Sequence, residues 1–235
     1  MALPKLNDKP KYELTIPSTG KKVKYRPYLV KEEKILMMAL ESGDKQSALN
    51  AVIDTIEACV SGQVDRNDLT IFDIEYMFIM IRSKSVGEVS EVGIKCTSCS
   101  TVNEISIQLD NVHVEKPDNK LSEIELSDTI SLKMKYPSFS DVSSLEGKDL
   151  SNTEKVFHLI GKCLESVTTD DEHILIKDTP EAEVTEFIES LSSSQFMKVK
   201  DFIEKIPSVE KEVKFKCKSC LAENEILLRG IDDFF

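Results

Sequence analysis

Residues 91–105 read Glu-Val-Gly-Ile-Lys-Cys-Thr-Ser-Cys-Ser-Thr-Val-Asn-Glu-Ile, and residues 212–226 read Glu-Val-Lys-Phe-Lys-Cys-Lys-Ser-Cys-Leu-Ala-Glu-Asn-Glu-Ile. At a constant offset of 121 residues, nine of the fifteen positions are identical. Two segments that match this closely indicate that a unit of strands, helices and a terminal cysteine pair has been duplicated. We therefore expect two copies that pack as a pseudo-symmetric pair.

Each copy contains a Cys-x-x-Cys pair between two strand-like segments, namely Cys96 with Cys99 and Cys217 with Cys220. Such a knuckle places two thiolates on one side of a tight turn. Tetrahedral zinc takes four ligands, and a closed four-thiolate set is typical of structural sites. No histidine is placed to complete either pair alone, so the sequence predicts one structural zinc shared by both knuckles.

Other interpretations of the cysteines stay open. The pairs are also compatible with reduced thiols in a diverged ribbon that binds no metal, and the spacing does not decide between zinc and iron. A thioredoxin-type redox pair is disfavoured because its cysteines lie at a helix N-terminus, and strand-like segments flank these pairs. Cys59 and Cys163 fall on apolar helical stripes and are expected in the core.

The composition limits the classes of partner. The chain of 235 residues has a net charge of −12, which argues against nonspecific binding to nucleic acid or to an anionic membrane. No segment approaches the ~18 uninterrupted apolar residues of a membrane span, and the first residues lack the apolar stretch of a secretory signal. We expect a reducing cytoplasm, where cysteines bind metal or pack in the core more often than they form disulfides.

The order of elements predicts an α+β fold made of two strand–helix–knuckle units, over residues 1–112 and 113–235, with the knuckles joined in a zinc-ribbon-like site. The two units are expected to pack intimately, as two domains or as one. Alternating apolar residues over 12–26 predict a β-hairpin.

Cap residues predict where several helices begin. Asp44 and Thr70 are expected N-caps. Thr153 is expected to start a helix whose apolar stripe runs to Val167, and Ser194 is expected to open the last helix.

The sequence offers no constellation for catalysis. None of the three histidines, His113, His158 and His173, lies in a recognisable base or ligand motif, and the eight glycines form no phosphate-binding loop. The carboxylates show no pattern of a buried pair. We therefore expect that the protein is not an enzyme.

Several segments together are typical of one known family. They are residues 14–22 (Leu-Thr-Ile-Pro-Ser-Thr-Gly-Lys-Lys), 26–36 (Arg-Pro-Tyr-Leu-Val-Lys-Glu-Glu-Lys-Ile-Leu), 72–78 (Phe-Asp-Ile-Glu-Tyr-Met-Phe) and 82–88 (Arg-Ser-Lys-Ser-Val-Gly-Glu). This pattern resembles the baseplate hub and hub assembly proteins of T4-like contractile-tailed bacteriophages, closely in the N-terminal half and loosely in the second half. The resemblance implies a part in building the baseplate hub and brings no catalytic residues.

We therefore expect a noncatalytic protein-interaction factor of baseplate hub assembly, acting in the cytoplasm of the bacterial host on other hub or tape-measure proteins. One alternative is a stoichiometric structural subunit of the hub in the virion baseplate. Another is a zinc-ribbon protein that binds nucleic acid. Four lysines near the knuckles favour that last alternative, and the net charge opposes it; they are Lys95, Lys214, Lys216 and Lys218.

Two places are candidates for partner binding. Arg26 and Tyr28 lie at the junction between the predicted hairpin and the next helix, where the alternative is a well-packed corner. Phe234 and Phe235 end the chain, and we expect them either as an exposed anchor for a partner or as residues that close the core.

Overall fold

The structure is a computed structural model that describes residues 10–114, 122–144 and 151–234. It has the expected mixture of helices and strands, and it divides into two compact units. The first unit combines Met1–Glu115 with Ser208–Phe235, and the second is Lys116–Pro207. The division expected from the sequence assigned residues 208–235 to the second unit. In the structure they belong with the first, because Val209, Val213 and Phe234 share one apolar cluster with Ile79 and Ile94.

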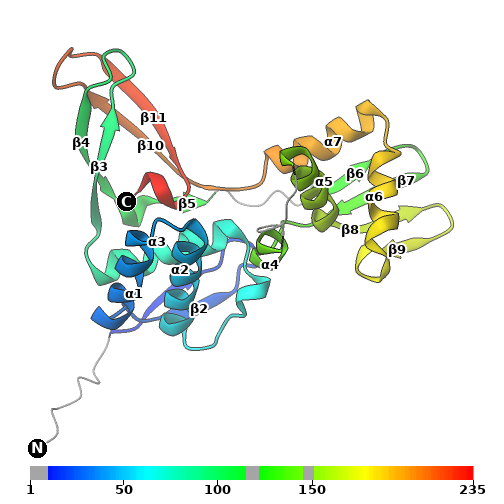
Figure 1. The fold of residues 1–235 in the computed structure, drawn as a ribbon, viewed down its shortest axis with the longest axis horizontal. Coiled ribbons are helices and arrows are strands. Elements are labelled where there is room, and N and C mark those ends of the chain that lie inside the picture. The colour runs from blue at the N-terminus through cyan, green and yellow to red at the C-terminus, as the bar shows by residue number, and fades with distance from the viewer. Residues whose placement is uncertain (1–9, 115–121, 145–150, 235) are drawn as a thin grey trace, which may run out of the picture. The chain divides into compact units, whose positions relative to one another are not determined.

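The first unit is a helical body with two β-hairpins that project from it (Figure 1). Its elements are β1 (Tyr12–Thr15), β2 (Lys22–Tyr25), α1 (Val30–Glu41), α2 (Lys45–Val60), η1 (Arg66–Asp68), α3 (Ile71–Ser85), β3 (Val89–Lys95), β4 (Val102–Gln108), η2 (Leu109–Asn111), β5 (His113–Val114), β10 (Val209–Lys216), β11 (Glu223–Arg229) and η4 (Ile231–Asp233). The hairpin expected over residues 12–26 is present as β1 and β2.

Helix α3 is the centre of the helical body. The Thr70 hydroxyl accepts the N–H of Asp73, and the Asp73 carboxylate accepts the N–H of Thr70, which closes a capping box. Apolar side chains on several faces of the helix are buried, including Phe72, Met77 and Ile81. A helix that is apolar nearly all round packs inside a protein, so α3 forms the core on which the hairpins and the other helices rest.

The hairpins β3–β4 and β10–β11, here called the arm, point the same way from the helical body (Figure 1). Their pairing is equivalent, since Val92 faces Ile105 in one hairpin and Val213 faces Ile226 in the other, at the offset of 121 residues. Their inner faces and Ile79 of α3 share one apolar cluster. This shared register supports duplication, which stays a hypothesis.

The second unit packs helices against a four-stranded antiparallel sheet of order β6-β7-β8-β9. Its elements are β6 (Glu123–Glu125), β7 (Ile130–Met134), α4 (Phe139–Ser143), α5 (Asn152–Cys163), β8 (Leu164–Thr169), β9 (His173–Leu175), η3 (Ile176–Asp178), α6 (Glu181–Glu189) and α7 (Ser193–Glu204). The helix expected to reach Val167 ends at Cys163, because residues 164–169 instead pair with β7. Within the described residues, no helix is long and apolar enough to span a membrane.

Candidate metal centre

Four cysteine sulfurs converge where the tips of the arm meet. Cys96 and Cys99 lie in the turn between β3 and β4, and Cys217 and Cys220 lie in the turn between β10 and β11. The four Sγ atoms lie within 4.8 Å of one another, and the Cys96–Cys220 and Cys99–Cys217 sulfurs are each 3.6 Å apart. Zinc–sulfur bonds of ~2.3 Å in a tetrahedron place the sulfurs about 3.8 Å apart. The cluster therefore fits one tetrahedral metal ion.

Backbone N–H groups surround the first sulfur of each knuckle. The amide of Ser98 donates to Cys96 Sγ, and the amide of Ser219 donates to Cys217 Sγ, both at 3.4 Å. The N–H groups of Cys220 and Ser219 lower the pKa of the Cys217 thiol to about 6. The thiolate is the form that binds metal. The neighbouring thiols raise the pKa of Cys220 to about 12, so the four sulfurs share their protons unequally when no metal is bound.

The two knuckles have the same backbone geometry. Ser100 donates its N–H to the carbonyl of Cys96 at 2.9 Å, and Leu221 donates to the carbonyl of Cys217 at 3.1 Å. Ser100 and Leu221 both have positive φ angles, 58° and 62°, a region that non-glycine residues seldom occupy. The same uncommon conformation therefore recurs at two positions 121 residues apart, and it gives both turns the same shape.

Two buried asparagines join the knuckles, and the sequence did not single them out. Asn103 of β4 accepts the N–H of Lys218, and Asn224 of β11 accepts the N–H of Thr97, both at 2.9 Å. The available signal was the identity of Asn-Glu-Ile in both copies. An asparagine is not expected as a zinc ligand, so the pattern of metal ligands does not point to it.

The other two cysteines lie in the core, as expected. Cys59 is 2% exposed in α2 and Cys163 is 0% exposed in α5. Burial raises the pKa of Cys59 to about 11 and that of Cys163 to about 12. Both stay neutral thiols at physiological pH and are inert.

The histidines lie in three different settings. His113 is an exposed residue of β5 that faces Glu210. His158 of α5 lies 3.4 Å from a carboxylate oxygen of Glu181. The ring of His173 in β9 is hydrogen-bonded to a threonine hydroxyl at 2.9 Å. Among the described residues, the group that converges for a metal consists of the four cysteines.

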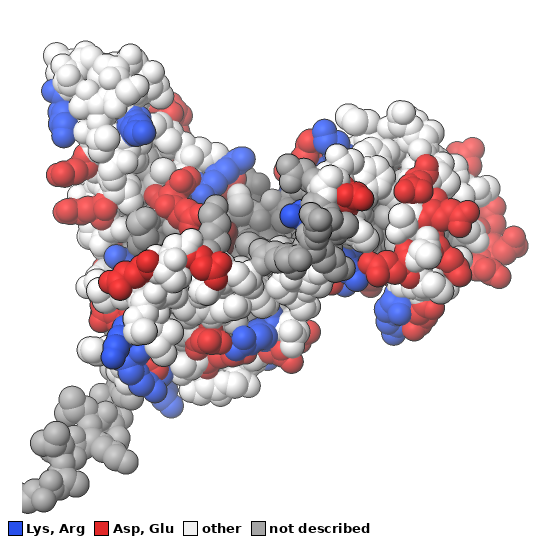
Figure 2. All heavy atoms as spheres, viewed as in Figure 1, with Lys and Arg blue, Asp and Glu red and all other residues white. Residues whose placement is uncertain are grey.

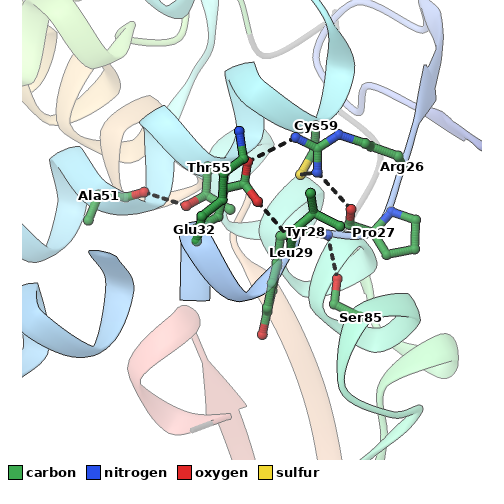
Figure 3. A network of polar contacts seen from close by, with 10 residues as sticks. Arg26, Pro27, Tyr28, Leu29, Glu32, Ala51, Thr55, Cys59 and Ser85 are labelled. Carbon is green, nitrogen blue, oxygen red and sulfur yellow. Dashed lines mark hydrogen bonds and ion pairs between the residues drawn. The ribbon is translucent and has the colours of Figure 1, made fainter. Parts of the chain in front are cut away.

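Arg26 and Tyr28 form part of a packed corner between β2 and α1 (Figure 3). Arg26 Nη2 lies 2.9 Å from Glu32 Oε1, and Glu32 Oε2 accepts the N–H of Leu29 at 2.7 Å. The N–H of Tyr28 donates to Ser85 Oγ at 2.9 Å. The Arg26 side chain is only 16% exposed. These contacts explain the conformation of the corner, and the role of Arg26 and Tyr28 in partner binding stays a prediction.

Phe234 is buried in the apolar cluster of the arm. Its side chain is 0% exposed, and its carbonyl accepts a hydrogen bond from Ser90 Oγ at 2.7 Å. Of the two expectations for the C-terminal aromatics, Phe234 follows the one in which it closes the core. Its burial argues against a role as a surface anchor. Phe235 lies outside the described residues.

Comparisons with known proteins give one family and one relative. A family model described as T4 bacteriophage base plate protein matches residues 9–235. The baseplate hub assembly protein gp26 of Enterobacteria phage T4 is 25% identical over 225 residues, which cover 95% of this chain and 97% of that protein. No solved structure matches the chain. The family match spans both units and all four cysteines.

Proposed function

The chain belongs to the family of T4 bacteriophage base plate proteins, and we propose that it is a noncatalytic protein-interaction factor of baseplate hub assembly. A structural or assembly role in the baseplate follows from the family. The observation that carries the finer proposal is the match to a hub assembly protein along nearly the whole of both chains. We infer that its partners are other baseplate hub proteins or the tape-measure protein.

The exposed surface of α1 supports binding through apolar contact. Large apolar side chains of this helix are 52–79% exposed; they are Val30, Ile35, Met37, Met38 and Leu40. Leu36 and Glu32 face the interior instead. Exposed apolar side chains supply contact area at protein interfaces, and in α1 they alternate with the charged residues Lys31, Glu33 and Lys34. Acidic charge would keep such a protein soluble while apolar contact supplies the affinity.

We propose that Cys96, Cys99, Cys217 and Cys220 hold one structural zinc. The sulfur separations and the backbone N–H groups that donate to Cys96 and Cys217 support this proposal. A four-thiolate site leaves no open coordination position for a substrate, so the ion would join the two hairpins of the arm and would not catalyse a reaction. The ion would then link the β3–β4 turn, near the middle of the chain, to the β10–β11 turn near its C-terminus.

The arrangement of charges disfavours binding to nucleic acid. Lys214, one of the lysines near the knuckles, lies 3.0 Å from Glu212 and 3.1 Å from Glu225. Figure 2 shows Asp and Glu interspersed with Lys and Arg over the visible face. Nucleic-acid binding requires a basic patch or stripe. The carboxylates of Glu212 and Glu225 neutralise Lys214 and so break up the group of lysines near the knuckles.

Co-expression with the hub and tape-measure proteins of the same phage tests the proposed function. We expect that Met38→Lys together with Leu40→Lys reduces co-purification with one of these proteins at least about tenfold, since hot-spot residues dominate such interfaces. Val156→Lys is the matched control, because Val156 is also exposed on a helix, at 48%. Binding that is equal for all variants would contradict the role of α1.

Purified virions separate the two roles in the baseplate. An assembly factor is absent from mature particles, and detection of the protein at a fixed number of copies per particle would instead establish the structural hub subunit.

A further inference from the structure

The two knuckles exchange side-chain hydrogen bonds in a reciprocal pattern. Asn103 Oδ1 accepts the N–H of Lys218, and Asn224 Oδ1 accepts the N–H of Thr97, each at 2.9 Å. Lys218 corresponds to Thr97 and Asn224 to Asn103 at the offset of 121 residues. The exchange is therefore a pseudo-twofold pair, in which each hairpin supplies the same donor and the same acceptor.

Each asparagine also holds its own hairpin. Asn103 Nδ2 donates to the carbonyl of Thr101 at 2.9 Å, and Asn224 Nδ2 donates to the carbonyl of Ala222 at 3.0 Å. The two side chains are only 3% and 5% exposed. A carboxamide is suited to both tasks because it carries an acceptor and a donor. Losing it would remove the side-chain acceptor of the Lys218 or Thr97 N–H, which costs free energy. The carbonyls of Thr101 and Ala222 would keep the N–H groups of Cys96 and Cys217.

The exchange fixes the backbone next to the sulfurs. Thr97 directly follows Cys96, and Lys218 directly follows Cys217, so the two bonded amides adjoin the first ligand of each knuckle. Asn103 Nδ2 also lies 3.8 Å from Cys217 Sγ. Every donor and acceptor in this exchange belongs to the chain itself, so the exchange needs no metal ion. The apolar cluster around Phe234 also holds the two hairpins together, nearer the helical body.

We propose that Asn103 and Asn224 are positioning residues that dock the two knuckles before metal binds, so that the four thiols form a preorganised site. The inference rests on the proposed zinc site, but the docking itself requires no metal. Metal binding then adds to the stability of hairpins that are already folded. This behaviour differs from that of small zinc domains, which are unfolded without their metal.

Amide hydrogen exchange of the full chain, stripped of metal by a chelator, tests the docking. The amides of Thr97 and Lys218 are expected to be protected without metal, and protection of both is expected to fall in Asn103→Ala and in Asn224→Ala. Glu104→Ala and Glu225→Ala are the matched controls, because these exposed residues directly follow the asparagines. Unprotected Thr97 and Lys218 amides in the metal-free wild type would overturn the inference.

Zinc affinity tests the positioning role. Changes in the groups that orient metal ligands typically reduce affinity about 10–100-fold, and we expect this loss for each alanine variant, with a four-sulfur cobalt spectrum retained. Asn103→Asp keeps the acceptor and removes the donor, so it provides a milder variant if the alanine variants do not fold. Wild-type affinity in the asparagine variants would overturn the inference and leave the zinc site intact. If the wild-type protein binds no zinc, the proposed zinc site is wrong. The protection of the Thr97 and Lys218 amides would still test whether the asparagines dock the two knuckles.

Discussion

The carboxylate of Asp73 accepts both the N–H and the hydroxyl of Ser18, at 2.9 and 2.6 Å, across 55 residues of sequence. Ser18 lies in the turn between β1 and β2, and Asp73 lies in the first turn of α3. The segments 14–22 and 72–78, which carry the family resemblance, thus hold each other in place. These hydrogen bonds give Ser18 and Asp73 a structural role in the helical body.

Asp73→Ala should be strongly destabilising. Asp73 is 0% exposed and also accepts the N–H and the hydroxyl of Thr70, so its removal leaves several donors without a partner. We expect a loss of about 3 kcal/mol in the free energy of unfolding for Asp73→Ala and about 1 kcal/mol for Ser18→Ala. Thr19→Ala, in the same turn, should be neutral. Urea denaturation measures all three, and an equal loss in Thr19→Ala would contradict the assignment.

Glu32→Gln should change how stability depends on pH. Burial opposes ionisation of Glu32, but hydrogen bonds from Arg26 and Leu29 outweigh it and hold the pKa below its ordinary value of 4.5. A lowered pKa in the folded state contributes stability above the ordinary value, and that stability is lost as the pH falls through the lowered pKa. The free energy of unfolding of the wild type should therefore exceed that of Glu32→Gln most at neutral pH. This difference in stability should shrink on acidification below pH 4.5.

Denaturation series of both proteins across this range, with exposed Glu41→Gln as the control, measure the effect. A difference between wild type and Glu32→Gln that stays constant with pH would show that the ionised form of Glu32 is not what stabilises the corner.

Phe234→Ala should destabilise the first unit. Replacing a fully buried phenylalanine by alanine typically costs about 3–5 kcal/mol through lost burial and the cavity left behind. Asp232→Ala is the control, because Asp232 is an exposed neighbour in η4. Thermal unfolding provides the measurement. A Phe234→Ala protein that melts like the wild type but loses its partner would restore the anchor role.

Removing the metal should lower the melting temperature and leave the hairpins docked. A ligand that binds only the folded state adds about 2.7 kcal/mol at a free concentration of 100 times its Kd, and chelation removes this contribution. Limited proteolysis should still spare β10 and β11, because Asn103, Asn224 and Phe234 hold them to the first unit. Rapid cleavage of the C-terminal hairpin after chelation would contradict the docking.

Helix starts show where sequence reasoning succeeds and where it fails. Asp44 and Thr70 cap α2 and α3 as expected. The expected starts at Thr153 and Ser194 each lie one residue late, since α5 begins at Asn152 after the N-cap Ser151 and α7 begins at Ser193 after the N-cap Ser192. Both regions offer several hydroxyl residues, so composition alone does not select one.

The capping-box pattern would have selected the correct residues. Ser151 is followed three positions later by Glu154, and Ser192 is followed in the same way by Gln195. The sequence did not predict strands β8 and β9. Helix α5 ends at Cys163 and β8 begins at the next residue, Leu164, and neither is a glycine or a proline. The pairing with β7 that ends the helix is a tertiary interaction.

The candidate site was only partly readable from the sequence. Ligand chemistry and spacing identified the four cysteines, because each Cys-x-x-Cys pair supplies half of a tetrahedral set. The asparagines carry no such signal, since their importance lies in contacts between hairpins more than 100 residues apart. Likewise, the sequence around Phe234 shows no apolar periodicity from which its burial could be predicted.

The metal content of the purified protein tests the shared site most directly. Protein prepared without added metal should contain one zinc per chain by elemental analysis. Cys96→Ser and Cys217→Ser, which each remove one ligand from a different hairpin, should each abolish high-affinity binding of that same ion. Two ions per chain would show that the knuckles bind metal separately. A metal content that falls only by half in either serine variant would show the same. No bound metal and four freely reactive thiols in the native protein would contradict the site altogether.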